Sequence, residues 1–235
     1  MKRLLLFICF IYGKSSFGQL EFKNSNVGRD MNLTDLDGRS LLKKYDADVT
    51  GSPFINDNWV SAKITLSKGK EIGPLPIKVN LESNELYYLD SAKVELIADK
   101  NVVRRVDCID YFSKDGANYI FKNGYAAIDK QDENFYYQVF TEGKIELIAK
   151  KFKYIRSEKN DLTGEMSKAF VDGNVVLYVS AYGLMQAFHP TKEFVSSLFE
   201  ADKASAAKAF IDTNKINFKK NADLIKLFNY YNSLN

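Results

Sequence analysis

YYQVFTEGKIELIAKKFKYI, residues 136–155, contains β-forming runs on both sides of the turn signal TEGK. Side chains of a strand alternate between its two faces. Around Tyr137 this alternation puts aromatic or apolar side chains on both faces, so we expect the first strand to be covered on both sides. In the last strand, Phe152 and Tyr154 share one face and the neighbouring lysines share the other. The segment therefore predicts a hairpin inside a larger sheet.

The same pattern extends over residues 59–189. Short runs rich in Val, Ile, Tyr and Phe alternate with turn signals: SKGK, SNE, ADKN, SKDGAN, KNGY, QDEN, TEGK and VDGN. Turns spaced roughly 8 to 12 residues apart are typical of an antiparallel meander and not of strand-helix-strand units. We therefore expect a mainly β (α+β) protein whose meander forms a sandwich or a strongly curved open sheet.

Beyond Pro190 the apolar period changes from 2 to 3.6 residues, which indicates helices. Thr191 is the expected N-cap of TKEFVSSLFE, and Asp202 is the expected N-cap of DKASAAKAFID. NADLIKLFNYY carries apolar side chains at i, i+3, i+4 and i+7: Leu224, Leu227, Phe228 and Tyr231. These patterns predict about three short C-terminal helices, each amphipathic enough to pack on the β domain.

The first residues, MKRLLLFICFIYGKSSFGQ, have the three parts of a secretory signal peptide. Lys2 and Arg3 give a basic start, and an apolar run of about nine residues follows, too short to cross a bilayer. Ser16 and Gly18 are small residues at the cleavage region. We expect cleavage after Gly18 and a secreted or periplasmic product. Cys9 lies inside the apolar run and not at the new N-terminus, so a lipoprotein is not expected.

Removal of residues 1–18 takes away three basic residues and no acid, so the formal net charge falls from +3 to zero. A neutral chain lacks the excess of Lys and Arg that nucleic-acid binding favours, so no nucleic-acid partner is expected. Cys108 alone remains after cleavage, so no internal disulfide is expected. No later window reaches the length of a transmembrane helix.

The composition divides the chain into four parts. Residues 1–18 form the signal peptide, and residues 19–50 form a polar N-terminal arm rich in Asn, Asp and Gly. Residues 51–189 form the antiparallel β domain, and residues 190–235 form the helical segment packed on it.

Three segments resemble a family of exported, β-rich Bacteroidota proteins of unknown function: GSPFINDNWV, the hairpin YYQVFTEGKIELIAKKFKYI and the end NKINFKKNADLIKLFNYYNSLN. The resemblance runs from about Gly51 to Asn235 and leaves the polar arm outside. It implies export, a β-rich body and a helical end. It carries over no activity, substrate or site residue, because the family has none assigned.

Trp59 is the only tryptophan, and it follows the turn signal SPFINDN. An indole beside Asn and Asp side chains suits stacking on a sugar face. Packing at a sheet corner explains the same residue without a ligand. We expect Trp59 to be largely buried at such a corner.

His189 is the only histidine, in AFHP, and the sequence offers it no obvious nucleophile as a partner. By alternation, Cys108 shares a face with Val106 and Asp110, and it is expected to be an ordinary strand thiol. A Ser-His-Asp or Cys-His device is therefore not expected. One His and one Cys also cannot supply the ligand set of a zinc site, and no metal or cofactor is expected.

RDMNLTDLDGRS is acidic and contains glycine, as calcium loops do. Counted from Asp30, however, the EF-hand spacing puts Asp35 where glycine is required and Leu41 where a bidentate Glu belongs. We expect a solvated polar loop.

KKFKYIRSEK, residues 150–159, mixes basic and aromatic residues as a groove for single-stranded nucleic acid does. Export and a neutral mature chain favour a solvated strand face instead.

No catalytic residue stands out, and the ligand-binding residues stay unknown at this level. We expect a non-enzymatic binding or structural module at the cell envelope that recognises a protein, a glycan or a lipid. A carboxylate-based hydrolase of envelope or dietary glycans is the alternative, since two acids need only lie about 5 to 10 Å apart. Two facing carboxyls in a deep cleft would favour the hydrolase, a flat or concave face would favour binding, and a continuous apolar cavity would favour a lipid.

Signal-peptide cleavage predicts a mature N-terminus at Gln19, because Ser16 and Gly18 occupy the small-residue positions. Intact-mass measurement of the exported protein checks this position. An exported product that still carries Met1 to Gly18 would contradict it.

Overall fold

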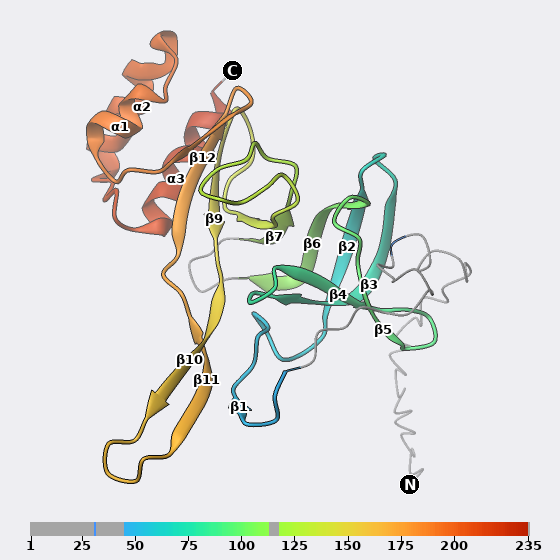
Figure 1. The fold of residues 1–235 in the computed structure, drawn as a ribbon. Coiled ribbons are helices and arrows are strands. Elements are labelled where there is room, and N and C mark those ends of the chain that lie inside the picture. The colour runs from blue at the N-terminus through green and yellow to red at the C-terminus, as the bar shows by residue number, and fades with distance from the viewer. Residues whose placement is uncertain (1–30, 32–44, 113–117, 235) are drawn as a thin grey trace, which may run out of the picture.

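The computed structural model describes Met31, residues 45–112 and residues 118–234. The fold is mainly β, as the sequence predicted: a large antiparallel sheet of ten strands, a small sheet of three strands, and three helices that follow all the strands (Figure 1). The large sheet is open, with its strands in the order β13-β12-β9-β8-β7-β6-β2-β3-β4-β5. The predicted signal peptide lies outside the described residues.

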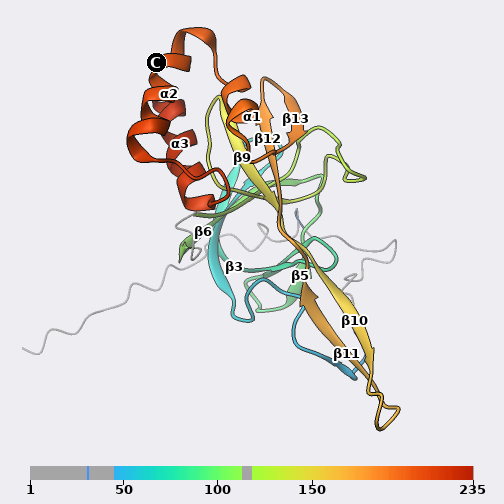
Figure 2. The ribbon, with the colours of Figure 1, turned by 90° about the vertical axis from the view of Figure 1, so that its left-hand side faces the viewer.

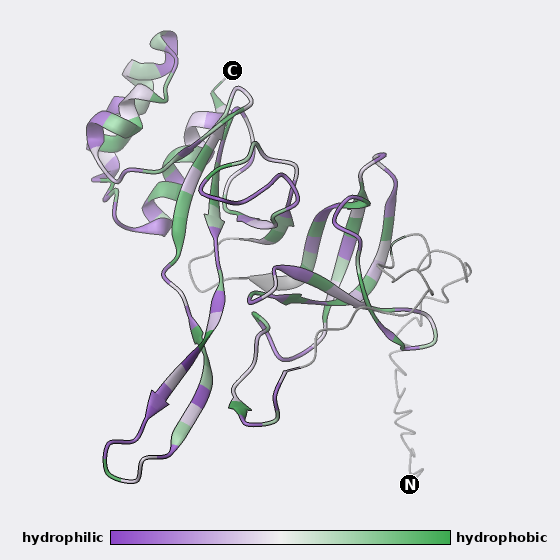
Figure 3. Ribbon diagram, viewed as in Figure 1, coloured by the Kyte–Doolittle hydropathy of each residue, from purple (hydrophilic) through white to green (hydrophobic). Residues whose placement is uncertain are grey.

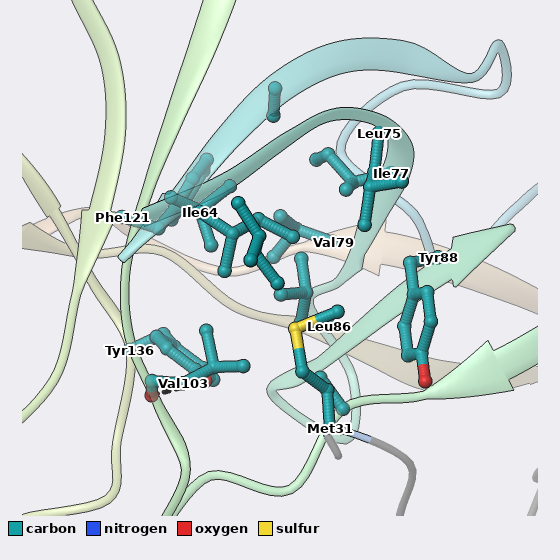
Figure 4. Packing of buried hydrophobic residues seen from close by; sticks show 14 of the residues in the cluster. Met31, Ile64, Leu75, Ile77, Val79, Leu86, Tyr88, Val103, Phe121 and Tyr136 are labelled. Carbon is teal, nitrogen blue, oxygen red and sulfur yellow. Dashed lines mark hydrogen bonds between the residues drawn. The ribbon is translucent and has the colours of Figure 1, made fainter. Parts of the chain in front are cut away.

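One half of the large sheet is a meander of four strands: β2 (Val60–Leu66), β3 (Glu71–Asn80), β4 (Glu85–Leu89) and β5 (Glu95–Ile97). Each strand pairs antiparallel with the next, and the predicted turns SKGK and SNE join the first three. Apolar side chains on one face of these strands, with others from β6 and β7, form a buried cluster (Figure 4).

The other half begins with β6 (Val103–Phe112), which pairs with β2 and so joins the two halves. A second meander follows: β7 (Asn118–Lys122), β8 (Tyr137–Val139) and β9 (Ile145–Lys150). β8 is covered on both faces, as predicted, since all three of its residues are buried. β2 shifts register against both of its partners, and such irregularities increase the local twist of a sheet.

After β9 the chain leaves the large sheet and then returns to it. β10 (Lys153–Lys159) and β11 (Met166–Asp172) form a hairpin that projects from the body, named here the projecting hairpin (Figures 1 and 2). β12 (Val176–Ala181) pairs back onto β9, and β13 (Leu184–Ala187) forms the edge. β1 (Val49–Thr50) pairs parallel with β11, which completes the small sheet.

The turns predicted from the sequence leave out one that the structure contains. The turn signal VDGN lies between two strands, where β11 leads into β12 at the base of the projecting hairpin. The turn between β10 and β11 lies at residues 160–165, which the named turn signals do not include, and there the Asn160 carboxamide accepts hydrogen bonds from the N–H groups of Leu162 and Thr163. Asn160 and Gly164, which has a positive φ of 75°, are turn residues, so the sequence contains a turn signal there that the prediction missed.

Three helices end the described chain: α1 (Lys192–Ser197), α2 (Ala201–Asn214) and α3 (Asn221–Ser233). The prediction that Thr191 is the N-cap of the first is confirmed, since its hydroxyl accepts a hydrogen bond from the Phe194 N–H. Among the described residues, no helix combines the length and the apolar character that a membrane crossing requires.

The prediction that Asp202 caps α2 is wrong. The helix begins one residue before it, and Glu200 is the N-cap residue. Tertiary contacts hold Glu200 in this place, because its N–H donates to the Tyr231 hydroxyl and its carboxylate accepts from the Tyr182 hydroxyl. These contacts override the local capping preference of Asp202, which lies in the first helical turn, where a negative charge is favourable.

Met31 comes from the segment that composition marks as a polar arm, and it is fully buried in the cluster of the first meander (Figure 4). Its carbonyl accepts a hydrogen bond from the Asp99 N–H at 2.7 Å. Tyr45 from the same segment donates a hydrogen bond to Glu82. The described parts of residues 19–50 are therefore part of the packed fold.

α3 covers β9 and β12. The predicted stripe Leu224, Leu227, Phe228 and Tyr231 is buried, which confirms the helical period read from the sequence. Asn232 fixes the end of the helix to the β8–β9 turn: its carboxamide accepts from the Ile145 N–H and donates to the carbonyls of Glu142 and Ile145. Gly143, at φ +137, leaves room for this side chain, because a Cβ at that position would collide with it.

Phe228 is fully buried between α3 and the sheet, so Phe228→Ala should lower the free energy of unfolding by about 3 to 5 kcal/mol, the cost of removing a core phenylalanine. Chemical denaturation followed by circular dichroism measures this change. Asn229→Ala, on the exposed side of the same helix, is the matched control and should change stability little. Equal effects of the two substitutions would show that α3 is not part of the core.

Candidate functional site

A cleft with a volume of about 410 Å³ lies at the base of the projecting hairpin. Four segments far apart in the sequence line it: residues 81–84 after β3, Lys100 before β6, residues 130–135 before β8, and residues 150–153 between β9 and β10. Its volume falls in the range of small-ligand sites, roughly 300 to 1,000 Å³. It is named here the lysine cleft, after the four lysines in its lining: Lys100, Lys130, Lys150 and Lys153.

Asparagine side chains hold two walls of the cleft in place. The Asn80 carboxamide accepts hydrogen bonds from the N–H groups of Glu82 and Ser83, which shapes the turn after β3. Asn84 has a positive φ of 55°, and its carboxamide both donates to the Tyr136 carbonyl and accepts from the Tyr136 N–H. This pair of bonds, 2.9 and 3.0 Å long, ties the turn to the segment before β8.

Phe152 shapes the wall on the side of the hairpin. Its ring occupies the space that a Cβ on Gly173 would need, so glycine is required there for the ring to lie against the opposite strand. The Lys150 ammonium group lies over two rings, 5.5 Å from the centroid of Phe152 and 5.7 Å from that of Phe135. Cation–π contacts of this kind hold the ammonium group at the cleft without neutralising its charge.

Two other lysines differ in their surroundings. The Lys153 ammonium group donates to the carbonyls of Ser52 and Phe54, at 2.9 and 2.8 Å, and thereby fastens the hairpin base to the body. Lys100 is half-buried, and burial lowers the pKa of its ammonium group below the usual range, with Glu85 and Asp132 acting in the opposite direction. Burial of this cation is unfavourable unless an anion accompanies it.

Two carboxylates also line the cleft. Glu82 accepts a hydrogen bond from the Tyr45 hydroxyl at 2.8 Å, and Asp132 accepts one from the Asn134 N–H at 3.0 Å. Four ammonium groups against two carboxylates leave the lining with a net charge of +2. The cleft therefore favours an anionic ligand.

The structure places Trp59 away from this cleft. Trp59 is partly but not fully buried and precedes β2, where its same-face neighbours Ser61 and Lys63 are exposed. The Lys78 ammonium group lies 4.9 Å from the ring centroid and covers one face of the indole. A lysine stem thus takes the place of the apolar neighbours that full burial would need.

Cys108 and His189 have separate surroundings. Cys108 packs against the cluster of the first meander, and burial raises the pKa of its thiol to about 12, which makes it unreactive at neutral pH. His189 is exposed ahead of α1 and contacts the edge of the Phe194 ring, with centroids 5.2 Å apart. The prediction of an ordinary strand thiol is confirmed for Cys108.

Among the residues that the structure describes, no three His, Cys, Asp or Glu side chains are grouped so that they could hold a metal ion. Apart from Met31, the acidic loop from Asp30 to Leu41 lies outside those residues. The prediction made for that loop therefore stays a prediction.

Sequence reasoning missed the lysine cleft. KKFKYIRSEK contains Lys150, Phe152 and Lys153, but the other lining residues lie in turns about 20 to 70 positions earlier, which have no spacing in common. The expectation of a solvated strand face holds for residues 154–159, which are exposed. Nothing in a linear pattern indicates that these turns meet.

Comparison with family models, with curated proteins and with solved structures gives no match for this chain. The family resemblance read from its sequence stays a prediction. A functional proposal therefore rests on the residues of this chain alone.

Substitution of Lys100 tests whether burial of its ammonium group lowers the stability of the folded protein. Because burial lowers the pKa of Lys100 in the folded state, the unfolded chain binds more protons, and folding is disfavoured most below the lowered pKa. Lys100→Met should therefore raise the thermal midpoint at pH 7, with a gain that shrinks as the pH approaches about 10.4. Scanning calorimetry at several pH values measures it, with Lys208→Met on the exposed face of α2 as control. A lower midpoint for Lys100→Met would contradict the unfavourable burial.

Proposed function

We propose that the protein is an exported, non-enzymatic binding module that holds an acidic segment of a glycan in the lysine cleft. The observation that carries the proposal is the excess of lysines over carboxylates around one ligand-sized cleft. Burial of the Lys100 ammonium group lowers the stability of the fold, and selection removes such a residue unless it has a role. Binding sites often keep residues that lower stability in this way.

The lining suits a sugar acid better than an apolar ligand. Ser83, Asn84 and Gln131 add hydroxyl and carboxamide groups to the lysines, which matches the many hydrogen-bonding groups of a saccharide. Phe135 and Phe152 supply apolar surface for the C–H face of a ring. Lysine acts as a point charge for carboxylate, sulfate or phosphate, and it does not demand the planar geometry that arginine does.

Export and location at the cell envelope belong to the proposal, because the leader MKRLLLFICFIYGKSSFGQ has the pattern of a secretory signal. Acidic polysaccharides are accessible to a protein in the periplasm or outside the cell. A binding role also agrees with the separate surroundings of Cys108 and His189.

Isothermal titration with oligogalacturonates tests the ligand class, and methyl-esterified oligogalacturonates are the matched ligands without charge. The acidic ligand should bind, and the ester should bind at least about tenfold more weakly, since a charge-assisted hydrogen bond contributes about 1.5 to 3 kcal/mol. Lys150→Gln should weaken binding by a similar factor, whereas Lys208→Gln should leave it unchanged. Equal affinity for acid and ester, or no effect of Lys150→Gln, would refute the proposal.

The hydrolase alternative rests on one observation, that Glu82 and Asp132 line the same cleft. If the protein cleaves glycans, new reducing ends should accumulate during the titration, and Glu82→Gln and Asp132→Asn should each abolish them. Binding without new reducing ends supports the non-enzymatic module.

A further inference from the structure

The outer edge of β10 is unpaired within the described part of the chain. In the small sheet the strand order is β1-β11-β10, so β1 covers one side of β11 and β10 covers the other. The covered side is reinforced, because Lys168 forms ion pairs with Asp46 and Asp48 at 3.4 and 3.0 Å. β10 is mostly hydrophilic, and all of its residues after Lys153 are exposed (Figure 3).

Two hydrogen bonds at the hairpin base show which backbone groups point outward. The Phe152 carbonyl accepts from the Gly173 N–H, on the side of β11, whereas the Lys153 N–H donates to the Leu81 carbonyl, away from β11. Backbone groups alternate in direction along a strand. The N–H and C=O groups of every second residue therefore point to the open edge: Ile155, Ser157 and Lys159.

The sequence of this edge is complementary to its own reverse. With Ser157 opposite Ser157 of a second antiparallel copy, Arg156 lies opposite Glu158, Ile155 opposite Lys159, and Tyr154 opposite Asn160. Opposite charges that face each other across two strands stabilise their pairing, and like charges destabilise it. No other register centred on a residue of β10 puts Arg156 opposite an acid of β10, because Glu158 is its one acid.

We propose that β10 pairs antiparallel with β10 of a second copy of this chain, around a two-fold axis at Ser157. The axis then passes through the Ser157–Ser157 pair, whose backbone N–H and C=O groups point at each other. The Ile155–Lys159 pairs on both sides are hydrogen-bonded pairs of the same type. The Arg156–Glu158 pairs lie between them, at the positions where facing side chains come closest. The two small sheets become one continuous sheet with a self-complementary interface.

A second copy fits this edge better than a foreign strand does. Within one chain Arg156 and Glu158 already form an ion pair of 2.9 Å, with both side chains about half-exposed. In the dimer each of these side chains gains a second partner of opposite charge, and neither loses its first. The dimer also covers part of Tyr154 and Ile155, which are 43% and 37% exposed. The hairpin projects from the body (Figure 2), so pairing along β10 would leave the two bodies apart.

Sedimentation velocity of the full chain over a range of about 1 to 100 μM tests the proposal, since small interfaces of this kind associate weakly. The wild-type protein should shift from monomer to dimer. Arg156→Glu and Glu158→Arg should each weaken association by about tenfold or more, because each turns two attractive pairs into repulsive ones. An equimolar mixture of the two variants should dimerise again, because their charges then match across the axis.

The double variant Arg156→Glu/Glu158→Arg should also dimerise like the wild type. Glu165→Arg in the hairpin turn, outside β10, is the control and should leave association unchanged. Circular dichroism establishes that each variant folds. A wild-type protein that stays monomeric over the whole range, or a mixture that associates no better than the single variants, overturns the proposal.

Discussion

The contact between the Phe152 ring and the backbone of Gly173 marks the point where the chain leaves the large sheet for the projecting hairpin and returns to it. It lies where β9 gives way to β10 and where β11 gives way to β12. On one side of this contact β9 and β12 belong to the large sheet. On the other side β10 and β11 form the projecting hairpin. Any side chain at position 173 would displace the ring, and with it a wall of the lysine cleft and the ring below the Lys150 ammonium group.

The cleft and the unpaired edge both lie next to this contact. Within the described residues, the outer backbone groups of β10 have no neighbouring strand, except at Lys153, whose N–H donates to the Leu81 carbonyl. The ammonium group of Lys153 donates hydrogen bonds to the carbonyls of Ser52 and Phe54 at the base of the hairpin. Of the other lysines at the cleft, Lys130 is exposed, whereas Lys100 and Lys150 are half-buried.

Patterns with a short period carried most of what the sequence could predict. Alternation around Tyr137 indicated a strand buried on both faces, and the stripe from Leu224 to Tyr231 indicated a helix with one buried face. Both depend on neighbours within a few residues. The N-cap of α2 depends instead on Tyr231, about 30 residues away, and the expectation for Asp202 failed for that reason.

The cleft escaped prediction for a related reason. A formal charge of zero for residues 19–235 is an average, and folding brings four lysines but only two acids, Glu82 and Asp132, to the cleft. Trp59 attracted attention because it is unique, yet its surroundings are set by Lys78 on an adjacent strand. In both cases the order of the strands in the sheet decides which residues become neighbours. A local sequence pattern does not contain that order.

Asn232 joins segments that are made at different times during synthesis. Its carboxamide completes the backbone hydrogen bonds of Glu142 and Ile145, which precede it by 90 and 87 positions. Ribosomes make the chain from its N-terminus, so β9 and β12 exist for several seconds, at about 5 to 20 residues per second, before the segment that covers them. During that interval Leu147 and Val179, both fully buried in the finished protein, face water or a chaperone. The face of β9 and β12 that α3 covers therefore stays open until α3 has been made.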